Sequence, residues 1–276
     1  AVHGWLDLSG WDFRERGLVA LGGEWELYRN RLLNPADFAG GTETEGASYA
    51  DIPNAWFGSG TDPQPGGTEF GTYRLTIKLD PSDEGFGIRV NNILMSHRLF
   101  ANGRPIGGSG QPADNARDYM PGNTPYSTYI RPEGTELELI LQVADFTYPN
   151  GGGVDELQFG LQSDIQRLDH VKFSTEMAGM FILLMFGGYH LSIYVMRRKD
   201  KAYLYSAFYF LTMLMLLLMT GDKLLTQLLP GLPFEMAYKV YDLGGFSNIA
   251  VLGLFLHHLD GKLLTRKHLL ILLPPI

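Results

Sequence analysis

The run Met177–Met196 contains no Asp, Glu, Lys or Arg, and it constrains the fold of this chain more than any other feature. A helix rises about 1.5 Å per residue, so a run of this length crosses roughly 30 Å, the thickness of a bilayer's hydrocarbon core. A second charge-free run, Ala202–Gly221, follows directly after the basic segment Arg197–Lys201. One run alone is also compatible with a buried helix of a large soluble protein, but two runs around a short positive loop predict a membrane hairpin.

The distribution of Lys and Arg predicts how this hairpin is oriented. Basic residues next to helix ends are retained in the cytoplasm, so we expect Arg197–Lys201 inside the cell and everything before Met177 outside the cell membrane. A less regular third span is followed by further basic residues, namely Lys262, Arg266 and Lys267. We therefore predict a transmembrane region over 177–276, with spans at 177–196, 202–221 and 235–259 and the start of a fourth at 268.

Charge divides the chain at the same place. Residues 1–176 hold 13 Lys and Arg against 25 Asp and Glu, whereas residues 177–276 hold 9 against 5, which together give the net charge of −8. An acidic front half repels nucleic-acid phosphates, so no nucleic-acid partner is expected. It is compatible with a solvated domain that binds neutral small molecules or glycans. The chain has no cysteine, which excludes disulfides, thiol nucleophiles and thiolate metal sites.

The front half alternates apolar and polar residues with a period of two. In Thr72–Leu79 the apolar residues fall on every second position, and Glu136–Val143 repeats the pattern. Such alternation is typical of strands with one buried and one solvated face. Gly and Pro clusters separate the strands, and Asn102-Gly103 fits a tight hairpin turn. We predict an antiparallel sandwich or jelly roll over 1–164, with Trp25 in its core.

Helical spacing replaces this alternation near Asp164. The apolar residues Ile165, Leu168 and Val171 fit one helical face, which predicts a connecting helix over 165–176 that runs on into the first span. A continuous helix would form a stiff link between the sandwich and the bilayer, and a break near Ser174 would weaken it.

Two loops, at 57–70 and 107–125, are too long for plain connectors and are expected to bind ligand. They and their edges carry aromatic, amide and charged side chains that suit a sugar ring: Trp56, Gln111, Asn115, Arg117, Tyr119 and Tyr126. Aromatic residues at strand ends can equally plug the core. The candidate ligand contacts are Arg74, His97, Arg98, Asn102, Tyr119 and Asp145. Arg74 could instead form a salt bridge to Asp80 or Asp145, and His97 could be a satisfied surface histidine.

Several short motifs follow one another in a distinctive order. They are Gly23–Tyr28 (GEWELY), Leu32–Pro35 (LLNP), Phe70–Leu75 (FGTYRL), His97–Gly103 (HRLFANG), Leu141–Phe146 (LQVADF) and Gly151–Gly153. In this order they resemble the extracellular domain of bacterial seven-transmembrane receptors with diverse intracellular signalling modules. That domain is similar to the galactose-binding-like jelly roll of the family that contains β-galactosidases and β-glucuronidases. The resemblance covers about residues 1–165, and the pattern of apolar spans extends it.

The resemblance implies a receptor in a bacterial cell membrane whose N-terminal domain lies outside the cytoplasm and binds a carbohydrate-like ligand. It also implies a cytoplasmic output module beyond residue 276, and of the modules known in the family we expect a sensor histidine kinase, with a diguanylate cyclase or a phosphatase as alternatives. The chain starts at Ala1 without a signal sequence and stops in an apolar segment after His268, so we expect a piece of a longer protein. A homodimer is left open.

An enzyme is the other class of function that the sequence leaves open. A membrane-anchored glycoside hydrolase, or its accessory domain, needs two carboxylates that face each other across a cleft. The acidic pairs Asp83/Glu84 and Asp155/Glu156 are sequence neighbours, which point to opposite sides of a strand or turn. We therefore predict no catalytic residue, metal or cofactor in residues 1–276.

Overall fold

The computed structural model describes residues 1–38, 46–55, 69–94, 96–147, 153–229 and 231–259. The chain forms two compact units, Ala1–His170 and Val171–Ile276, and each is described by itself. Every strand that the structure describes lies in the first unit. The long loop expected at 57–70, most of the glycine motif at 151–153, Trp56 and the fourth span expected from 268 lie outside the described residues, apart from Glu69, Phe70 and Gly153.

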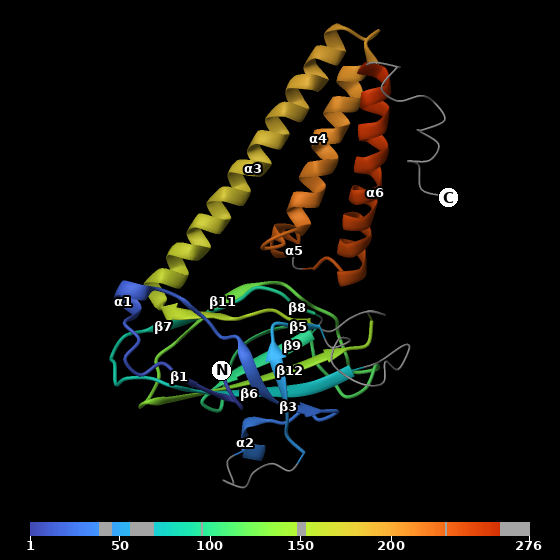
Figure 1. The fold of residues 1–276 in the computed structure, drawn as a ribbon. Helices are drawn as coiled ribbons and strands as arrows, with labels where there is room; N and C mark the ends of the chain where they lie inside the picture. The colour runs from blue at the N-terminus through green and yellow to red at the C-terminus, as the bar shows by residue number, and fades with distance from the viewer. Residues whose placement is uncertain (39–45, 56–68, 95, 148–152, 230, 260–276) are drawn as a thin grey trace. The chain divides into compact units, whose positions relative to one another are not determined.

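A seven-stranded sheet forms one layer of the first unit (Figure 1). Its strands lie in the order β10 (Arg104–Ser109), β9 (Ser96–Ala101), β12 (Glu136–Asp145), β6 (Glu69–Lys78), β3 (Gly23–Arg29) and β4 (Ser48–Ile52), and β1 (Trp5–Asp7) pairs with β6. All neighbours are antiparallel except β1 and β6, which run parallel. The two longest strands, β6 and β12, lie next to each other at the centre and fix the register of the sheet.

A four-stranded sheet forms the second layer. Its order is β11 (Tyr126–Ile130), β7 (Phe86–Val90), β14 (Gln158–Leu161) and β2 (Val19–Ala20). Three further two-residue strands, β5 (Asn54–Ala55), β13 (Gly153–Val154) and β8 (Ile93–Leu94), form a small third sheet. Two single-turn helices, α1 (Phe13–Arg16) and α2 (Pro35–Phe38), lie in the connections. The predicted fold class, an antiparallel β-sandwich followed by long apolar helices, is confirmed.

The main core fills the space between the two large sheets. Tyr73, Leu75 and Ile77 of β6 have no exposed surface, as their alternation predicts. Trp25 is also fully buried, and its Nε1–H donates to the carbonyl oxygen of Leu21 at 3.0 Å, so its one polar group is satisfied. The expected core role of Trp25 is confirmed.

A second, smaller core covers part of the outer face of the seven-stranded sheet. It consists of Tyr28, Leu33, Phe38, Phe100 and Ile140. The segment around α2 supplies two of these residues and lies over β12, whose residues from Leu139 to Asp145 are buried or nearly so on both faces. Burial on both faces explains why β12 has an apolar residue, Ile140, at an outward-facing position.

The helix α3 (Gln162–Met196) begins directly after the last strand of the sandwich. It starts at Gln162 rather than at 165, and its first residues, up to His170, belong to the first unit. The N–H of Gln162 donates to the carbonyl oxygen of Gly85 at 2.9 Å, which attaches the first turn to the residue just before β7. The helix is continuous through Ser174, as predicted, and ends at the predicted residue, Met196.

The second unit contains the rest of α3 together with α4 (Lys201–Met219), α5 (Leu224–Leu228) and α6 (Phe234–Leu259). In the described part of the chain, three helices, α3, α4 and α6, are long and apolar enough to cross a membrane. The bounds of α4 and α6 lie within two residues of the predicted spans 202–221 and 235–259, and α3 contains the whole of the predicted span 177–196 and ends with it. Asp200 caps the start of α4 by accepting the N–H of Ala202 at 3.2 Å.

Helices α4 and α6 pack against each other. Gly244 of α6 lies against the side chains of Met215 and Leu216, so the small residue permits a close approach of the two helices. A polar contact joins the same pair, since the amide nitrogen of Asn248 donates to the hydroxyl of Thr212 at 3.0 Å. Gly244 thus serves the packing of α4 against α6.

Candidate functional site

Arg74 lies near the middle of β6, on the outer face of the large sheet. Its guanidinium is 3.3 Å from the carboxylate of Glu26 on β3 and 2.7 Å from that of Glu138 on β12. It also lies over the ring of Phe38, with 4.8 Å between its Cζ atom and the ring centroid. Partial burial disfavours the charge, but the hydrogen bonds and the negative charges of Glu138 and Glu26 outweigh it and raise the pKa of Arg74.

The salt-bridge alternative for Arg74 is therefore realised, although with different partners from those expected. Asp80 accepts the N–H of Gly10 at 2.7 Å, and Asp145 accepts the N–H of Thr147 at 2.9 Å. The cross-strand neighbours of Arg74 supply its carboxylates instead, because Glu26 is directly opposite in the register. The donor fork of Arg74 is occupied by these two carboxylates.

His97 is buried in the interior of the sandwich and is not a surface histidine, so that expectation is wrong. It has 1% of its surface exposed, and its ring stacks on that of Tyr126 at a centroid separation of 5.6 Å. Within the described residues neither ring nitrogen of His97 has a hydrogen-bond partner, and the hydroxyl of Tyr126 is in the same situation. Burial lowers the pKa of His97 to about 3 and raises that of Tyr126, so both groups are neutral near pH 7.

Tyr119 and Asp145 lie at the same end of the large sheet as His97. The register places Ala144 beside Ser96 in β9 and beside Phe70 in β6, so the end of β12 meets the starts of two neighbouring strands. Tyr119 is 8% exposed and packs on Phe146, with 5.2 Å between ring centroids. Burial raises the pKa of Tyr119. The structure thus brings His97, Tyr119 and Asp145 to one end, where all three are buried.

The loop that carries Tyr119 uses most of its polar groups internally. Gln111 and Met120 form an isolated antiparallel bridge, and the amide of Gln111 donates to the carbonyl oxygen of Asp118 at 3.0 Å. The side-chain oxygen of Asn115 accepts the N–H groups of Arg117 and Asp118, both at 3.0 Å. These two amide side chains therefore hold the loop in shape, a role that local hydrogen bonding explains without a ligand.

Arg98 and Asn102 do not join that cluster. Arg98 is the exposed residue of β9. Asn102 is in the left-handed region with φ 46°, as is Gly103 with φ 81°, which confirms the predicted tight turn between β9 and β10. The side-chain oxygen of Asn102 accepts the N–H of Glu138 at 2.8 Å, so the turn is attached to the start of β12. The six predicted contacts therefore do not form one site.

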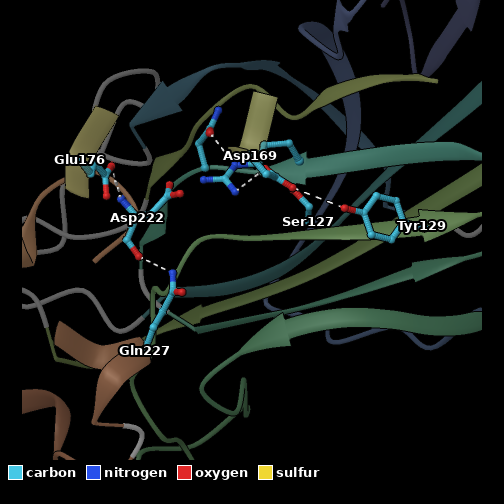
Figure 2. Close-up of polar contacts among 8 residues, drawn as sticks. Ser127, Tyr129, Asp169, Glu176, Asp222 and Gln227 are labelled. Carbon is cyan, nitrogen blue, oxygen red and sulfur yellow. Dashed lines mark hydrogen bonds and ion pairs between the residues drawn. The ribbon is translucent and has the colours of Figure 1, made fainter. Parts of the chain in front are cut away.

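A group of residues that sequence reasoning missed surrounds the start of α3 (Figure 2). Asp169 accepts hydrogen bonds from Arg89 at 2.8 Å, from Ser127 at 2.9 Å and, at a longer 3.5 Å, from the hydroxyl of Tyr129. The side chain of Arg89 is only 5% exposed and that of Asp169 is 26% exposed. Arg89 also contacts the side-chain oxygen of Asn91 at 3.4 Å. An ion pair this buried is expensive to break.

An apolar contact completes this attachment. Ile165 is fully buried and lies directly over Gly87 of β7, where a Cβ atom would approach the Ile165 side chain to 2.9 Å. Only glycine leaves room for the helix at that point. We call this set of contacts, Gly87, Arg89, Ser127 and Tyr129 around Ile165 and Asp169, the α3 seat.

In the second unit α3 has another polar attachment. The carboxylate of Glu176 accepts the N–H of Asp222 at 3.1 Å, and the carbonyl oxygen of Asp222 accepts the side-chain amide of Gln227 at 2.7 Å (Figure 2). These bonds join α3 to the turn between α4 and α5. Lys223 in the same turn donates to the hydroxyl of Tyr238 of α6 at 3.4 Å.

Among the described residues no cluster of three or more His, Asp or Glu side chains is arranged to hold a metal ion. One acid of the pair Asp83/Glu84 has a local partner. Glu84 is ion-paired with Arg14, which raises the pKa of Arg14 through a hydrogen bond and charge attraction. The contact between Glu84 and Arg14 is a structural one.

No protein-family model matches the chain, and no curated protein matches it either. Solved structures that resemble it include a β-glucuronidase from Ruminococcus gnavus, at 13% identity and a TM-score of 0.38 over 52% of this chain and 29% of that one. A GH2 β-galacturonidase from Eisenbergiella tayi gives 11% identity and a TM-score of 0.36, with 52% and 24% covered. A β-glucuronidase from an uncultured Clostridium gives 14% identity and a TM-score of 0.38, with 52% of this chain and 29% of that one covered. The chain thus spans less than a third of these enzymes, and likenesses this distant carry no information about a ligand or a reaction.

Proposed function

We propose that the chain is the ligand-sensing and membrane-embedded part of a bacterial transmembrane receptor. In this proposal the sandwich binds a carbohydrate-like ligand outside the cell membrane, and α3 passes the binding event to the helices. A cytoplasmic output module would follow the helices. We expect a sensor histidine kinase there, with a diguanylate cyclase or a phosphatase as alternatives.

The α3 seat is the observation that carries this proposal. A domain that merely holds a protein near its substrate needs only a flexible tether. Here the first turns of α3 are fixed to the sandwich by the buried Ile165 and by the ion pair of Asp169 with Arg89. The same helix then continues without a break through an apolar run long enough to cross a membrane. A displacement of β7 or β11 is thereby passed to α3.

The orientation proposed for the helices rests on the basic connection between α3 and α4. It contains Arg197, Arg198, Lys199 and Lys201, and such residues are retained on the cytoplasmic side. The absence of cysteine from the sequence makes this easy to test, because a single introduced thiol is the only one that reacts.

The test places one cysteine in the chain, at Lys199→Cys or at Ser48→Cys in the sandwich, and exposes intact cells to a membrane-impermeant maleimide. We expect Ser48→Cys to react at once and Lys199→Cys to react only after the membrane is permeabilised. Reaction of both in intact cells, or the reverse pattern, would overturn the orientation. A chain that stays monodisperse without detergent would overturn the membrane assignment itself.

The sensing step has its own measurement. A spin label on Lys199→Cys in lipid nanodiscs reports the mobility of the α3–α4 connection while neutral mono- and disaccharides are titrated. We expect a saturable change in the label's spectrum with at least one sugar. Saturable binding without any spectral change would leave the sandwich as a binding module and refute transmission. Hydrolysis of a chromogenic glycoside by the chain would favour the glycoside hydrolase instead.

A further inference from the structure

A groove opens at the end of the sandwich where β9 turns into β10 and where β11 leads to β12. It has a volume of about 460 Å³, and ligand pockets for small molecules commonly measure roughly 300–1,000 Å³. The buried residues Ala101 and Leu137 and the half-buried Ile106 and Ile130 form its apolar part. A surface with both an apolar part and a polar rim suits a ligand that is itself amphipathic.

The charges on the rim of the groove balance. Arg104 and Arg131 face the same space as Asp83 and Glu133. Arg104 is 3.6 Å from Glu133, but their side chains are 80% and 82% exposed, so water and salt screen this pair and a ligand can replace it. In the part of the chain that the structure describes, the side chains of Arg131 and Asp83 have neither a hydrogen bond nor an ion pair. Both donors and acceptors are therefore available at the rim.

This combination selects a neutral polyhydroxylated ligand. Carboxylates accept hydrogen bonds from hydroxyl groups and guanidinium groups donate to hydroxyl oxygens, so a rim with both can form hydrogen bonds to several hydroxyl groups of a sugar. A rim of zero net charge exerts no net electrostatic attraction on a charged ligand. An anion is further disfavoured because residues 1–170 hold 12 Lys and Arg against 24 Asp and Glu.

Tyr129 connects the groove to the α3 seat. It is 42% exposed and lines the groove, while its hydroxyl donates to Asp169 at 3.5 Å. Aromatic rings commonly bind the apolar face of a ring-shaped ligand, so Tyr129 is suited to contact a sugar. A bond of 3.5 Å is long for two oxygen atoms and leaves room to shorten or to break. A ligand that fixes the ring of Tyr129 therefore acts on the contact that Tyr129 makes with α3.

We propose that this groove binds a neutral sugar and that Tyr129 passes the occupancy of the groove to Asp169 on α3. The inference rests on the proposed function, since it names the site and the ligand class of the proposed sensor. Asn102 lies on the rim with its side-chain oxygen already bonded to Glu138, which leaves its amide hydrogens as further donors. Of the six contacts predicted from the sequence, Asn102 alone lines the groove.

The test uses the full chain in lipid nanodiscs and saturation-transfer NMR with glucose, galactose, cellobiose and maltose, together with galacturonate as an acidic sugar. We expect saturable binding of at least one neutral sugar. Arg131→Ala is expected to weaken it about tenfold, the loss of roughly one charge-assisted hydrogen bond. Arg29→Ala removes an exposed arginine elsewhere on the sandwich and is expected to bind as the unchanged chain does.

Two variants of Tyr129 separate binding from transmission. Tyr129→Phe keeps the ring and loses the hydroxyl, so it is expected to bind within about threefold of the unchanged chain. The sugar should then no longer alter amide exchange over 162–170. Tyr129→Ala is expected to lose binding about tenfold or more. Melting temperatures close to that of the unchanged chain establish that these exposed substitutions leave the fold intact.

The outcomes distinguish this inference from the proposed function. If a neutral sugar binds but Arg131→Ala and Tyr129→Ala bind it unchanged, the groove is the wrong site and the proposed sensor stands. If galacturonate alone binds, the neutral ligand class is wrong. If no sugar of the panel binds saturably, the groove and the carbohydrate ligand of the proposed function fall together.

Discussion

Replacing Asp169 with alanine is the most direct perturbation of the α3 seat. The change removes the carboxylate that Arg89 contacts at 2.8 Å and Ser127 at 2.9 Å, while the helix itself gains a residue of higher helix propensity. If amide hydrogens at the start of α3 then exchange faster with solvent, the cause is the lost contacts and not a weaker helix. We expect the first turns of α3 to detach from the sandwich more often.

The magnitude follows from the burial of the two charges. Removing one partner of a fully buried ion pair costs about 3–5 kcal/mol. The cost here is smaller because Asp169 is 26% exposed and because Arg89 keeps a contact of 3.4 Å with Asn91. The neutral hydrogen bond from Ser127 adds about 1 kcal/mol. We therefore expect the free energy of opening the α3 seat to fall by about 2–4 kcal/mol.

Hydrogen exchange measures this free energy locally. For the full chain in nanodiscs, amides over 162–170 should exchange about 30- to 1,000-fold faster in Asp169→Ala, whereas amides in β6 and β12 should change little. Arg167→Gln is the matched control, since it alters an exposed charge in the same turn of α3. Its exchange over the same residues should stay within a few fold of the unchanged chain.

A double variant isolates the ion pair. Combining Asp169→Leu with Arg89→Met replaces both charges with apolar groups, and buried pairs replaced in this way often lose little stability. The double variant should therefore regain much of the protection that Asp169→Leu alone loses. Unchanged exchange over 162–170 in Asp169→Ala would refute the idea that this pair holds the helix, whatever the double variant does.

Three further predictions concern other parts of the sandwich. Gly87→Val should destabilise the first unit by about 2 kcal/mol or more, because the new side chain overlaps that of Ile165. A melting temperature that falls further in Gly87→Val than in Gly87→Ala would support this. The pKa of His97 is about 3 in the fold against about 6.5 in the unfolded chain, so below pH 6.5 the unfolded chain takes up a proton that the fold does not, and stability should fall by up to about 1.4 kcal/mol per pH unit. The variant His97→Phe should lose this part of the pH dependence when its free energy of unfolding is measured at pH 7.5 and at pH 5. Arg74→Met should lower the free energy of unfolding by about 1–3 kcal/mol, because it leaves the carboxylate of Glu138 without its cation, and it should leave sugar binding unchanged. Weakened sugar binding at unchanged stability would contradict the structural role of Arg74.

The sequence was sufficient to predict those strands and helices whose apolar residues follow a regular pattern. The alternation in β6 and β12 and the apolar runs of α3, α4 and α6 each repeat one local pattern over many residues. Hydrophobic period alone therefore assigns the elements to strands or to helices of membrane length. The turn at Asn102 was predictable for a similar reason, since a positive φ restricts which residues a tight hairpin accepts.

Partner choice was not predictable, because it depends on register between distant strands. Arg74 was predicted to contact a ligand, with a salt bridge to Asp80 or Asp145 as the alternative, but β3 and β12 place Glu26 and Glu138 next to it. His97 reads as a polar residue in an alternating strand, yet its position falls on the inner face with Leu99. One signal for its burial was present: the alternation of Leu99 and Ala101 places His97 on the same face of β9.

The polar partners of α3 fix the direction in which the helix faces at two places. Asp169 and Glu176 are seven residues apart, so on a continuous helix they lie on nearly the same face. Each carboxylate is bonded within a different unit, Asp169 to the sandwich strands β7 and β11 and Glu176 to the backbone of Asp222. Lipid and core packing alone would fix such a helix without any buried charge. Hydrogen bonds depend on direction, so these contacts resist a rotation of α3 about its axis as well as a displacement along it. A rotation of α3 as one body therefore changes both sets of bonds, and the proposed receptor requires this of the helix that leads from the sandwich to the turn between α4 and α5.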